Sequence, residues 1–224
     1  MKFIYNNKEY NFPTSLSQIT LRQRIDFDKL YLKEIEDFQN EIFKKDKDEN
    51  VIEVDEVDEI LFTSFVASRN LSFFSGIPVN EVEDNIPIED VLNIFNSCFK
   101  AIYENQVIEI NSEGYLWNNE IWKIEQPKLS YESKITFNEL IVAKQIVKQM
   151  QDLSLGNWVA MVHLAVIFLK KENEVFEESW LASKSKRLEM MYDLPMDIAL
   201  SIGFFLQNSM NLYTKTSLFS EVEE

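Results

Sequence analysis

The chain has 224 residues, of which 46% are hydrophobic and 13% aromatic, and its formal net charge is −16. The apolar content excludes an intrinsically disordered chain, and the length allows one or two domains. Nucleic acid is bound mainly by neutralising phosphates with lysine and arginine, so the acidity argues against DNA or RNA as a direct ligand. The simpler interpretation of the negative charge is that it favours solubility. The more specific alternative is a surface that attracts a basic partner.

One ten-residue pattern occurs twice, as FIYNNKEYNF at 3–12 and as YLWNNEIWKI at 115–124. Apolar and polar residues alternate on both sides of an Asn-Asn pair. Alternation predicts a half-buried strand, and asparagine tolerates the left-handed backbone of a tight turn. Each segment is therefore predicted to form a β-hairpin, with Tyr5 facing Tyr10 across the first one.

The rest of the first half is predicted to be mostly helical. Residues 19–43 form a long amphipathic helix, because apolar side chains recur at intervals of three and four. An acidic insertion at 44–59 follows, which we expect to be a solvated loop or arm, although its valines would alternatively pair as a strand. A mostly apolar helix at 60–76 and a proline-led helix at 86–105 complete this half.

The second half repeats this order of elements. Its long helix starts in ITFNELIVAKQIVKQM, where Thr136 and Glu139 are spaced for a capping box. An apolar helix is predicted at 157–172, a short extra helix within 173–193, and a last, proline-led helix at 194–213.

These matches define the predicted fold. The chain is expected to be mainly α with small β-hairpins, an α+β fold, in two related hairpin-plus-helical-bundle units that arose by internal duplication. We place the boundary near residues 105–112. The predicted units are residues 1–106, which contain the insertion at 44–59, and residues 107–224, which end in an acidic tail.

The sequence carries no motif of catalysis, metal binding or phosphate binding. The only histidine, His163, lies in an apolar run, and the only cysteine, Cys98, lies among aromatic residues, so both are predicted to be packed side chains. We therefore expect no enzyme, no cofactor and no metal. The enzymatic alternative is a carboxylate-based hydrolase, whose site cannot be singled out among 38 Asp and Glu residues.

Two further features concern the compartment. No run of about 18 apolar residues is present, so we expect no contact with a membrane. A single cysteine cannot form an internal disulfide, which suits a reducing, intracellular compartment.

Large apolar side chains gather in the second half. Six of the seven methionines lie there: Met150, Met161, Met190, Met191, Met196 and Met210. Methionine suits adaptable surfaces that receive helices, although core packing is the simpler interpretation. We predict partner contacts at Trp158, Met161, Phe204 and Phe205.

The layout resembles small helical proteins of tailed-phage structural gene clusters, above all tail assembly chaperones. The segments WNNEIWKI, ITFNEL, MVHLAVIFL and LPMDIALSIGFFL carry the similarity. It implies a non-enzymatic protein of the host cytoplasm that binds apolar helices of a tape-measure-like client. The alternatives are a structural virion protein, such as a head–tail ring, connector or packaged cargo component, and an acidic inhibitor that mimics nucleic acid. Formation of a homo-oligomer stays open.

Overall fold

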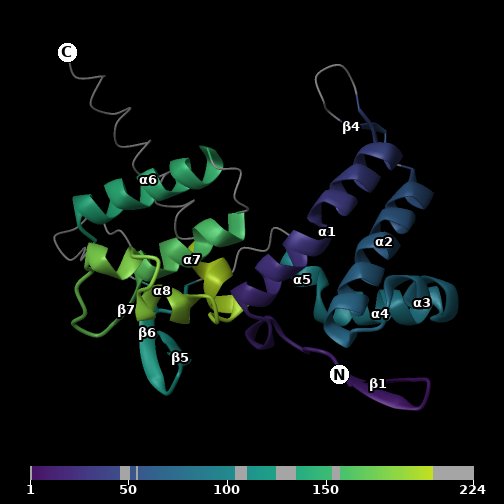
Figure 1. Cartoon of the computed structure of the whole chain (residues 1–224), viewed down its shortest axis with the longest axis horizontal. Coiled ribbons are helices and arrows are strands. Elements are labelled where there is room, and N and C mark those ends of the chain that lie inside the picture. The colour runs from purple at the N-terminus through teal and green to yellow at the C-terminus, as the bar shows by residue number, and fades with distance from the viewer. Residues whose placement is uncertain are drawn as a thin grey trace. The chain divides into compact units, whose positions relative to one another are not determined.

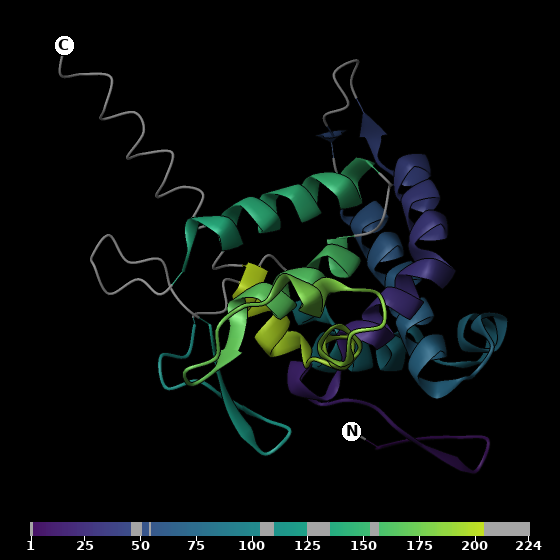
Figure 2. The ribbon, with the colours of Figure 1, turned by 60° about the vertical axis from the view of Figure 1, so that its left-hand side comes forward.

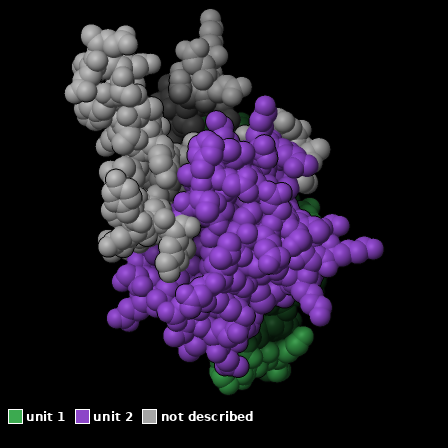
Figure 3. Space-filling model, turned by 90° about the vertical axis from the view of Figure 1, so that its left-hand side faces the viewer, with its two compact units in different colours: residues 1–19, 23–105 green, residues 20–22, 106–224 purple. Residues whose placement is uncertain are grey.

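The computed structural model (Figure 1) describes residues 2–45, 51–53, 55–103, 110–124, 135–152 and 157–203. As predicted, the described part is mainly helical with small antiparallel β-hairpins, an α+β fold. The chain divides into two compact units (Figure 3), Met1–Ile19 with Gln23–Asn105, and Thr20–Arg22 with Gln106–Glu224. The predicted division into domains at residues 1–106 and 107–224 stays a prediction.

The first unit consists of two small strand pairs and a set of helices. Its strands are β1 (Lys2–Tyr5), β2 (Lys8–Asn11), β3 (Lys44–Lys45) and β4 (Val51–Glu53). Its helices are the 3-10 helix η1 (Leu16–Gln18), α1 (Leu21–Ile42), α2 (Glu56–Ser75), α3 (Val79–Asn85), α4 (Ile88–Cys98) and α5 (Lys100–Tyr103). Leu21 and Arg22, the first two residues of α1, belong to the second unit.

The hairpin of β1 and β2 forms at the predicted turn. Asn6 and Asn7 have φ angles of 48° and 59°, the left-handed backbone that a two-residue hairpin turn needs. The predicted pairing of Tyr5 with Tyr10 is wrong, because a turn with only these two residues aligns Tyr10 with Phe3 instead.

The predicted loop at 44–59 is wrong in part. The strands β3 and β4 pair with each other in antiparallel register, and α2 already begins at Glu56. The carboxylate of Asp55 accepts a hydrogen bond of 2.9 Å from the backbone N–H of Val57, so an aspartate caps the helix. Residues 46–50 and 54 lie outside the described residues.

Aromatic pairs join α1 to α2, which run side by side (Figure 1). Phe38 stacks on Phe65 with ring centroids 3.9 Å apart, and Phe27 meets Phe73 edge-on at 5.6 Å. On α2, residues 66–72 are all buried, because the aromatic pairs hold α1 against one side of this helix and α3 and α4 pack against it as well. The middle of α2 is thus the centre of the first unit.

The second unit is built around a three-stranded sheet and its own helices. The strands are β5 (Tyr115–Trp117), β6 (Glu120–Ile124) and β7 (Leu169–Lys171), in the order β5-β6-β7. The helices are α6 (Phe137–Asp152), α7 (Asn157–Phe168), the 3-10 helix η2 (Glu178–Leu181) and α8 (Lys186–Met191), and residues 196–203 are helical as well. The helices α6 and α7 lie along each other in both ribbon views (Figures 1 and 2).

Local predictions for the second unit hold at its start and fail at the end of α7. The hydroxyl of Thr136 accepts from the backbone N–H of Glu139 at 3.2 Å, and the Glu139 carboxylate accepts from the N–H of Thr136 at 2.7 Å, which confirms the capping box. The helix predicted at 157–172 ends at Phe168 instead, because residues 169–171 pair with β6. The predicted helix beyond residue 203 and the acidic tail lie outside the described residues.

Three residues from early in the chain belong to the second unit. Thr20 forms an antiparallel bridge with Pro195, and the backbone N–H of Leu21 donates to the carbonyl of Leu194 at 2.9 Å. Arg22 is ion-paired with Asp193 at 2.8 Å. The second unit is therefore discontinuous in sequence.

The two units share the order of hairpin, long helix, buried helix and proline-led helix. They differ in their sheets, since β7 adds a third strand to the hairpin of the second unit, whereas β1 and β2 form a two-stranded sheet. The internal duplication stays a prediction. None of the described helices is long and apolar enough to cross a membrane.

Candidate partner-binding site

The predicted contact residues of the second half are partly described. Trp158 and Met161 lie on α7 and are half-buried. A Cβ atom added at Gly203 would lie 3.1 Å from the Met161 methyl carbon, so this methionine packs against the helical segment at 196–203. Phe204 and Phe205 lie outside the described residues. A role of these four residues in partner binding stays a prediction.

The other second-half methionines mostly fill the core. Met150, Met191 and Met196 are buried, as the simpler interpretation expects. Cys98 is buried too, and this burial raises the pKa of its thiol. His163 is half-buried, with its Nδ1 atom 3.0 Å from the carbonyl oxygen of Val159 in the same helix.

A surface pocket of about 250 Å³ lies in the first unit between α2, α3 and α4, with one side chain from α1. We call it the α2–α4 pocket. Its apolar lining includes Phe38, Leu61, Phe65, Val82, Ile88 and Val91, and its polar lining consists of Ser64, Ser68 and Glu83. Leu61 and Ile88 are 47% and 53% exposed, so large apolar side chains form its lip.

The apolar surface continues beyond the pocket along α2. Val57 and Ile60 are 59% and 52% exposed, and they precede Leu61 by four residues and one residue. Residues four apart lie on the same side of a helix. Contiguous exposed apolar surface on a protein typically marks a site of interaction with another molecule.

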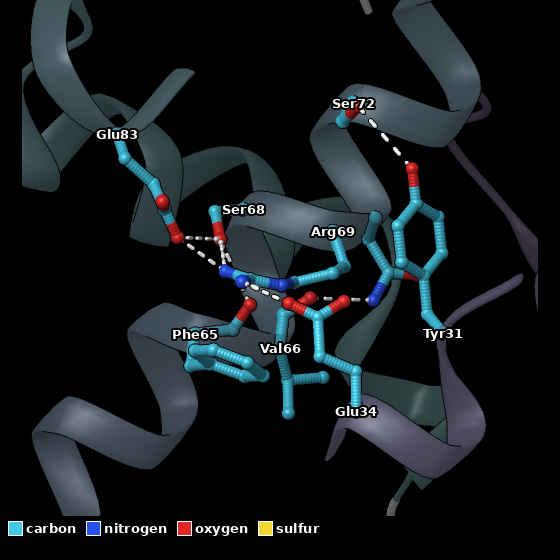
Figure 4. A network of polar contacts seen from close by, with 9 residues as sticks. Tyr31, Glu34, Phe65, Val66, Ser68, Arg69, Ser72 and Glu83 are labelled. Carbon is cyan, nitrogen blue, oxygen red and sulfur yellow. Dashed lines mark hydrogen bonds and ion pairs between the residues drawn. The ribbon is translucent and has the colours of Figure 1, made fainter. Parts of the chain in front are cut away.

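Arg69 of α2 holds the wall of the pocket in place (Figure 4). Its guanidinium donates to Glu34 of α1 at 2.6 Å, to Glu83 of α3 and to the hydroxyl of Ser68 at 2.8 Å. It also lies 3.4 Å from the ring centroid of Phe65, within the range of a cation–π contact. One buried cation therefore joins three helices.

The burial of this network is uneven. The Arg69 side chain is 6% exposed, whereas its partners Glu34 and Glu83 are 49% and 44% exposed. The positive charge is thus inside and both negative charges reach solvent. Glu83 also lines the α2–α4 pocket, so the same contacts that hold α3 against α2 leave the pocket formed before any partner arrives.

A second cluster of charged and aromatic residues lies in the second unit. The guanidinium of Arg187 lies 4.3 Å from the ring centroid of Trp122 and 4.9 Å from that of Trp180, and it donates to Glu174 at 2.8 Å. Burial lowers the pKa of Arg187. Trp122 is fully buried, so this cluster holds the sheet to the helices.

The described residues contain no group of three or more His, Cys, Asp or Glu side chains that could hold a metal ion. Burial raises the pKa of Asp28, the sign expected of a proton donor. This carboxylate, however, is ion-paired with Arg24 at 2.7 Å and is not among the residues that line the α2–α4 pocket.

Sequence reasoning missed the α2–α4 pocket. Apolar residues fall on every side of α2, including Val57, Leu61, Phe62 and Phe65, so the pattern does not show which side neighbouring helices leave open. The acidic residues that precede α2 are the available signal, because charged side chains favour solvent and so indicate that the N-terminal end of this helix is exposed. Comparison with known proteins adds no relative, since no protein-family model, no curated protein and no solved structure matches the chain.

Proposed function

We propose that the chain is a non-enzymatic phage assembly protein that binds a helix of another protein in the α2–α4 pocket. The observation that carries this proposal is the preformed pocket with Leu61 and Ile88 exposed at its lip. The phage context rests on the layout that resembles tail assembly chaperones, whose client is a long helical tape-measure-like protein.

The lining of the pocket favours an apolar protein side chain as its occupant. Seven of the ten lining residues are apolar, and Leu61 and Ile88 are exposed at the lip. An amphipathic helix that lies in a groove presents apolar anchors at positions i, i+3 or i+4, and i+7. One such anchor would enter the α2–α4 pocket, while its neighbours would lie on Val57 and Ile60.

The expected affinity suits a transient contact. Burying one leucine-sized side chain contributes about 1.5–3 kcal/mol, and about 1.4 kcal/mol changes Kd tenfold. One anchor in the pocket therefore contributes roughly one to two orders of magnitude. A chaperone must release its client when the tail forms, so modest affinity at each contact is an advantage.

The test compares two leucines of the first unit. Leu61→Gln places an amide at the lip of the pocket, and Leu30→Gln makes the same change on α1, where Leu30 is 65% exposed and is not among the lining residues. Tagged wild type and both variants are used to capture proteins from the native lysate, and the finished particles are analysed by mass spectrometry.

We expect wild type and Leu30→Gln to retain a long helical protein, Leu61→Gln to retain about tenfold less of it, and the chain to be missing from finished particles. Equal capture by all three forms would refute binding in the pocket. Stoichiometric presence of the chain in finished particles would make it a structural virion protein instead.

A further inference from the structure

We infer that the helix bound in the α2–α4 pocket is basic, with lysine or arginine residues flanking its apolar anchor. This inference rests on the proposed function and adds the chemical class of the partner.

All three helices carry carboxylates, and Glu83 is the one that lines the pocket itself. The carboxylates are Glu56, Asp58 and Glu59 on α2, Glu81, Glu83 and Asp84 on α3, and Glu89 and Asp90 on α4. The only basic residue on these helices is Arg69. Arg69 is buried, and its charge is paired with Glu34 and Glu83, so the exposed charges of α2, α3 and α4 are all negative.

The carboxylates also lie next to the apolar lip in sequence and along each helix. Glu89 follows Ile88 directly, and Glu59 precedes the exposed pair of Ile60 and Leu61. Both glutamates are exposed, and we call these two carboxylates the charged rim of the pocket. A helix whose anchor enters the pocket would therefore bring its flanking residues close to these carboxylates, where a lysine or arginine is attracted and a glutamate is repelled.

The same charges argue against two other occupants. A second copy of the chain carries a net charge of −16, and like charges brought together at an interface suppress binding. The C-terminal segment SLFSEVEE, residues 217–224, has three acidic residues and no basic one, so its own charge opposes insertion at this rim. A basic partner from another protein is the occupant that complements the pocket.

Two synthetic peptides of about 20 residues test the inference with the full-length chain. They share one apolar face, with a leucine anchor at positions i, i+3, i+4 and i+7, and differ only in the polar face, which is lysine-rich in one and glutamate-rich in the other. Fluorescence anisotropy of the labelled peptides gives Kd at 50 and 300 mM salt, and circular dichroism checks that each variant is folded.

Two pairs of variants separate the apolar pocket from its charged rim. Leu61→Gln changes the pocket, with Leu30→Gln as its control. Glu59→Gln with Glu89→Gln neutralises the rim, and Glu113→Gln with Glu172→Gln removes two exposed charges of the second unit, so the net charge of the chain changes equally in both doubles.

We expect the lysine-rich peptide to bind at least about tenfold more tightly than the glutamate-rich one at low salt, and to lose most of this advantage at 300 mM salt, because salt screens exposed charges. The rim double should weaken its binding by about threefold or more, while the double in the second unit leaves the binding unchanged. Leu61→Gln should weaken binding at both salt concentrations.

Other results have distinct meanings. Equal binding of both peptides that is insensitive to salt but lost in Leu61→Gln would keep the pocket as a helix site and overturn its basic preference. In a third result, both double variants weaken binding of the lysine-rich peptide equally, and Leu61→Gln leaves it unchanged. This would show only attraction to an acidic chain, and it would overturn the inference. Binding of neither peptide would refute the proposed function itself.

Discussion

Removing the two carboxylates that hold Arg69 should destabilise the first unit more than removing the arginine. Glu34→Gln with Glu83→Gln leaves a cation whose side chain is 6% exposed without a charged partner. Arg69→Met removes that cation and leaves two carboxylates that are 49% and 44% exposed. Because these carboxylates already reach solvent, water can hydrate them once their partner is gone.

The magnitudes follow from this difference in burial. Breaking a buried ion pair so that one charge stays buried alone costs about 3–5 kcal/mol. Arg69→Met loses the charged hydrogen bonds and the contact with Phe65, but methionine refills much of the space and no buried charge is left, so we expect a cost of about 1–2 kcal/mol. The double variant should therefore lose at least about 1 kcal/mol more than the single one.

Urea unfolding can follow the first unit separately. All four tryptophans, Trp117, Trp122, Trp158 and Trp180, lie in the second unit, so tryptophan emission reports that unit while circular dichroism reports the helices of both. Glu41→Gln with Asp84→Asn, exposed carboxylates on the same two helices, is the matched control and should cost less than about 0.5 kcal/mol. A cost for Arg69→Met equal to or above that of the Glu34/Glu83 double would refute the reasoning.

Three further predictions concern other buried or strained positions. Glu139→Gln leaves the buried ammonium of Lys170 without its carboxylate partner, so it should lower the free energy of unfolding by about 3–5 kcal/mol. Thr136→Ala removes only the cap hydroxyl and should lower it by about 1 kcal/mol. Urea unfolding followed by tryptophan emission compares the two variants, and similar costs would contradict the importance of the buried pair. Asn119 has a φ angle of 61°, so Asn119→Val should lower stability by about 1–2 kcal/mol while Asn119→Gly does not, and equal thermal midpoints for these two variants would count against a left-handed turn. Burial raises the pKa of Cys98, which lowers its thiolate fraction at pH 8, so an aromatic disulfide reagent should modify it much more slowly in the folded chain than in urea; equal rates would show that this thiol is accessible.

The hairpins and the capping box could be predicted because their signals are local. Asn118 and Asn119 adopt the left-handed backbone that their type favours, and Thr136 with Glu139 completes a cap within four residues. In each case the atoms that decide the structure are neighbours in sequence. The register of the first hairpin depends on the length of its turn. Because the turn contains only Asn6 and Asn7, Tyr10 lies opposite Phe3.

The misjudged positions depend on contacts with distant residues. Residues 169–171 continue an apolar run that suits a helix, but pairing of Leu169 with Ile124 on β6 makes them a strand, and such tertiary pairing readily overrides local preference. The α2–α4 pocket is similar, since Leu61 is a lip residue only because α3 and α4 pack beside α2 and leave this part of it open. Periodicity within one helix does not contain that information.

The short segment Thr20–Arg22 limits how the chain can be cut. A fragment that begins at residue 107 would lack the N–H groups of Leu21 and Arg22, which donate to the carbonyls of Leu194 and Tyr192 at 2.9 and 2.7 Å. It would also lose the cation that pairs with Asp193. Residues 107–224 expressed alone should therefore be less stable than in the whole chain, and a short peptide that spans Thr20–Arg22 should restore part of that stability when it is added to the fragment.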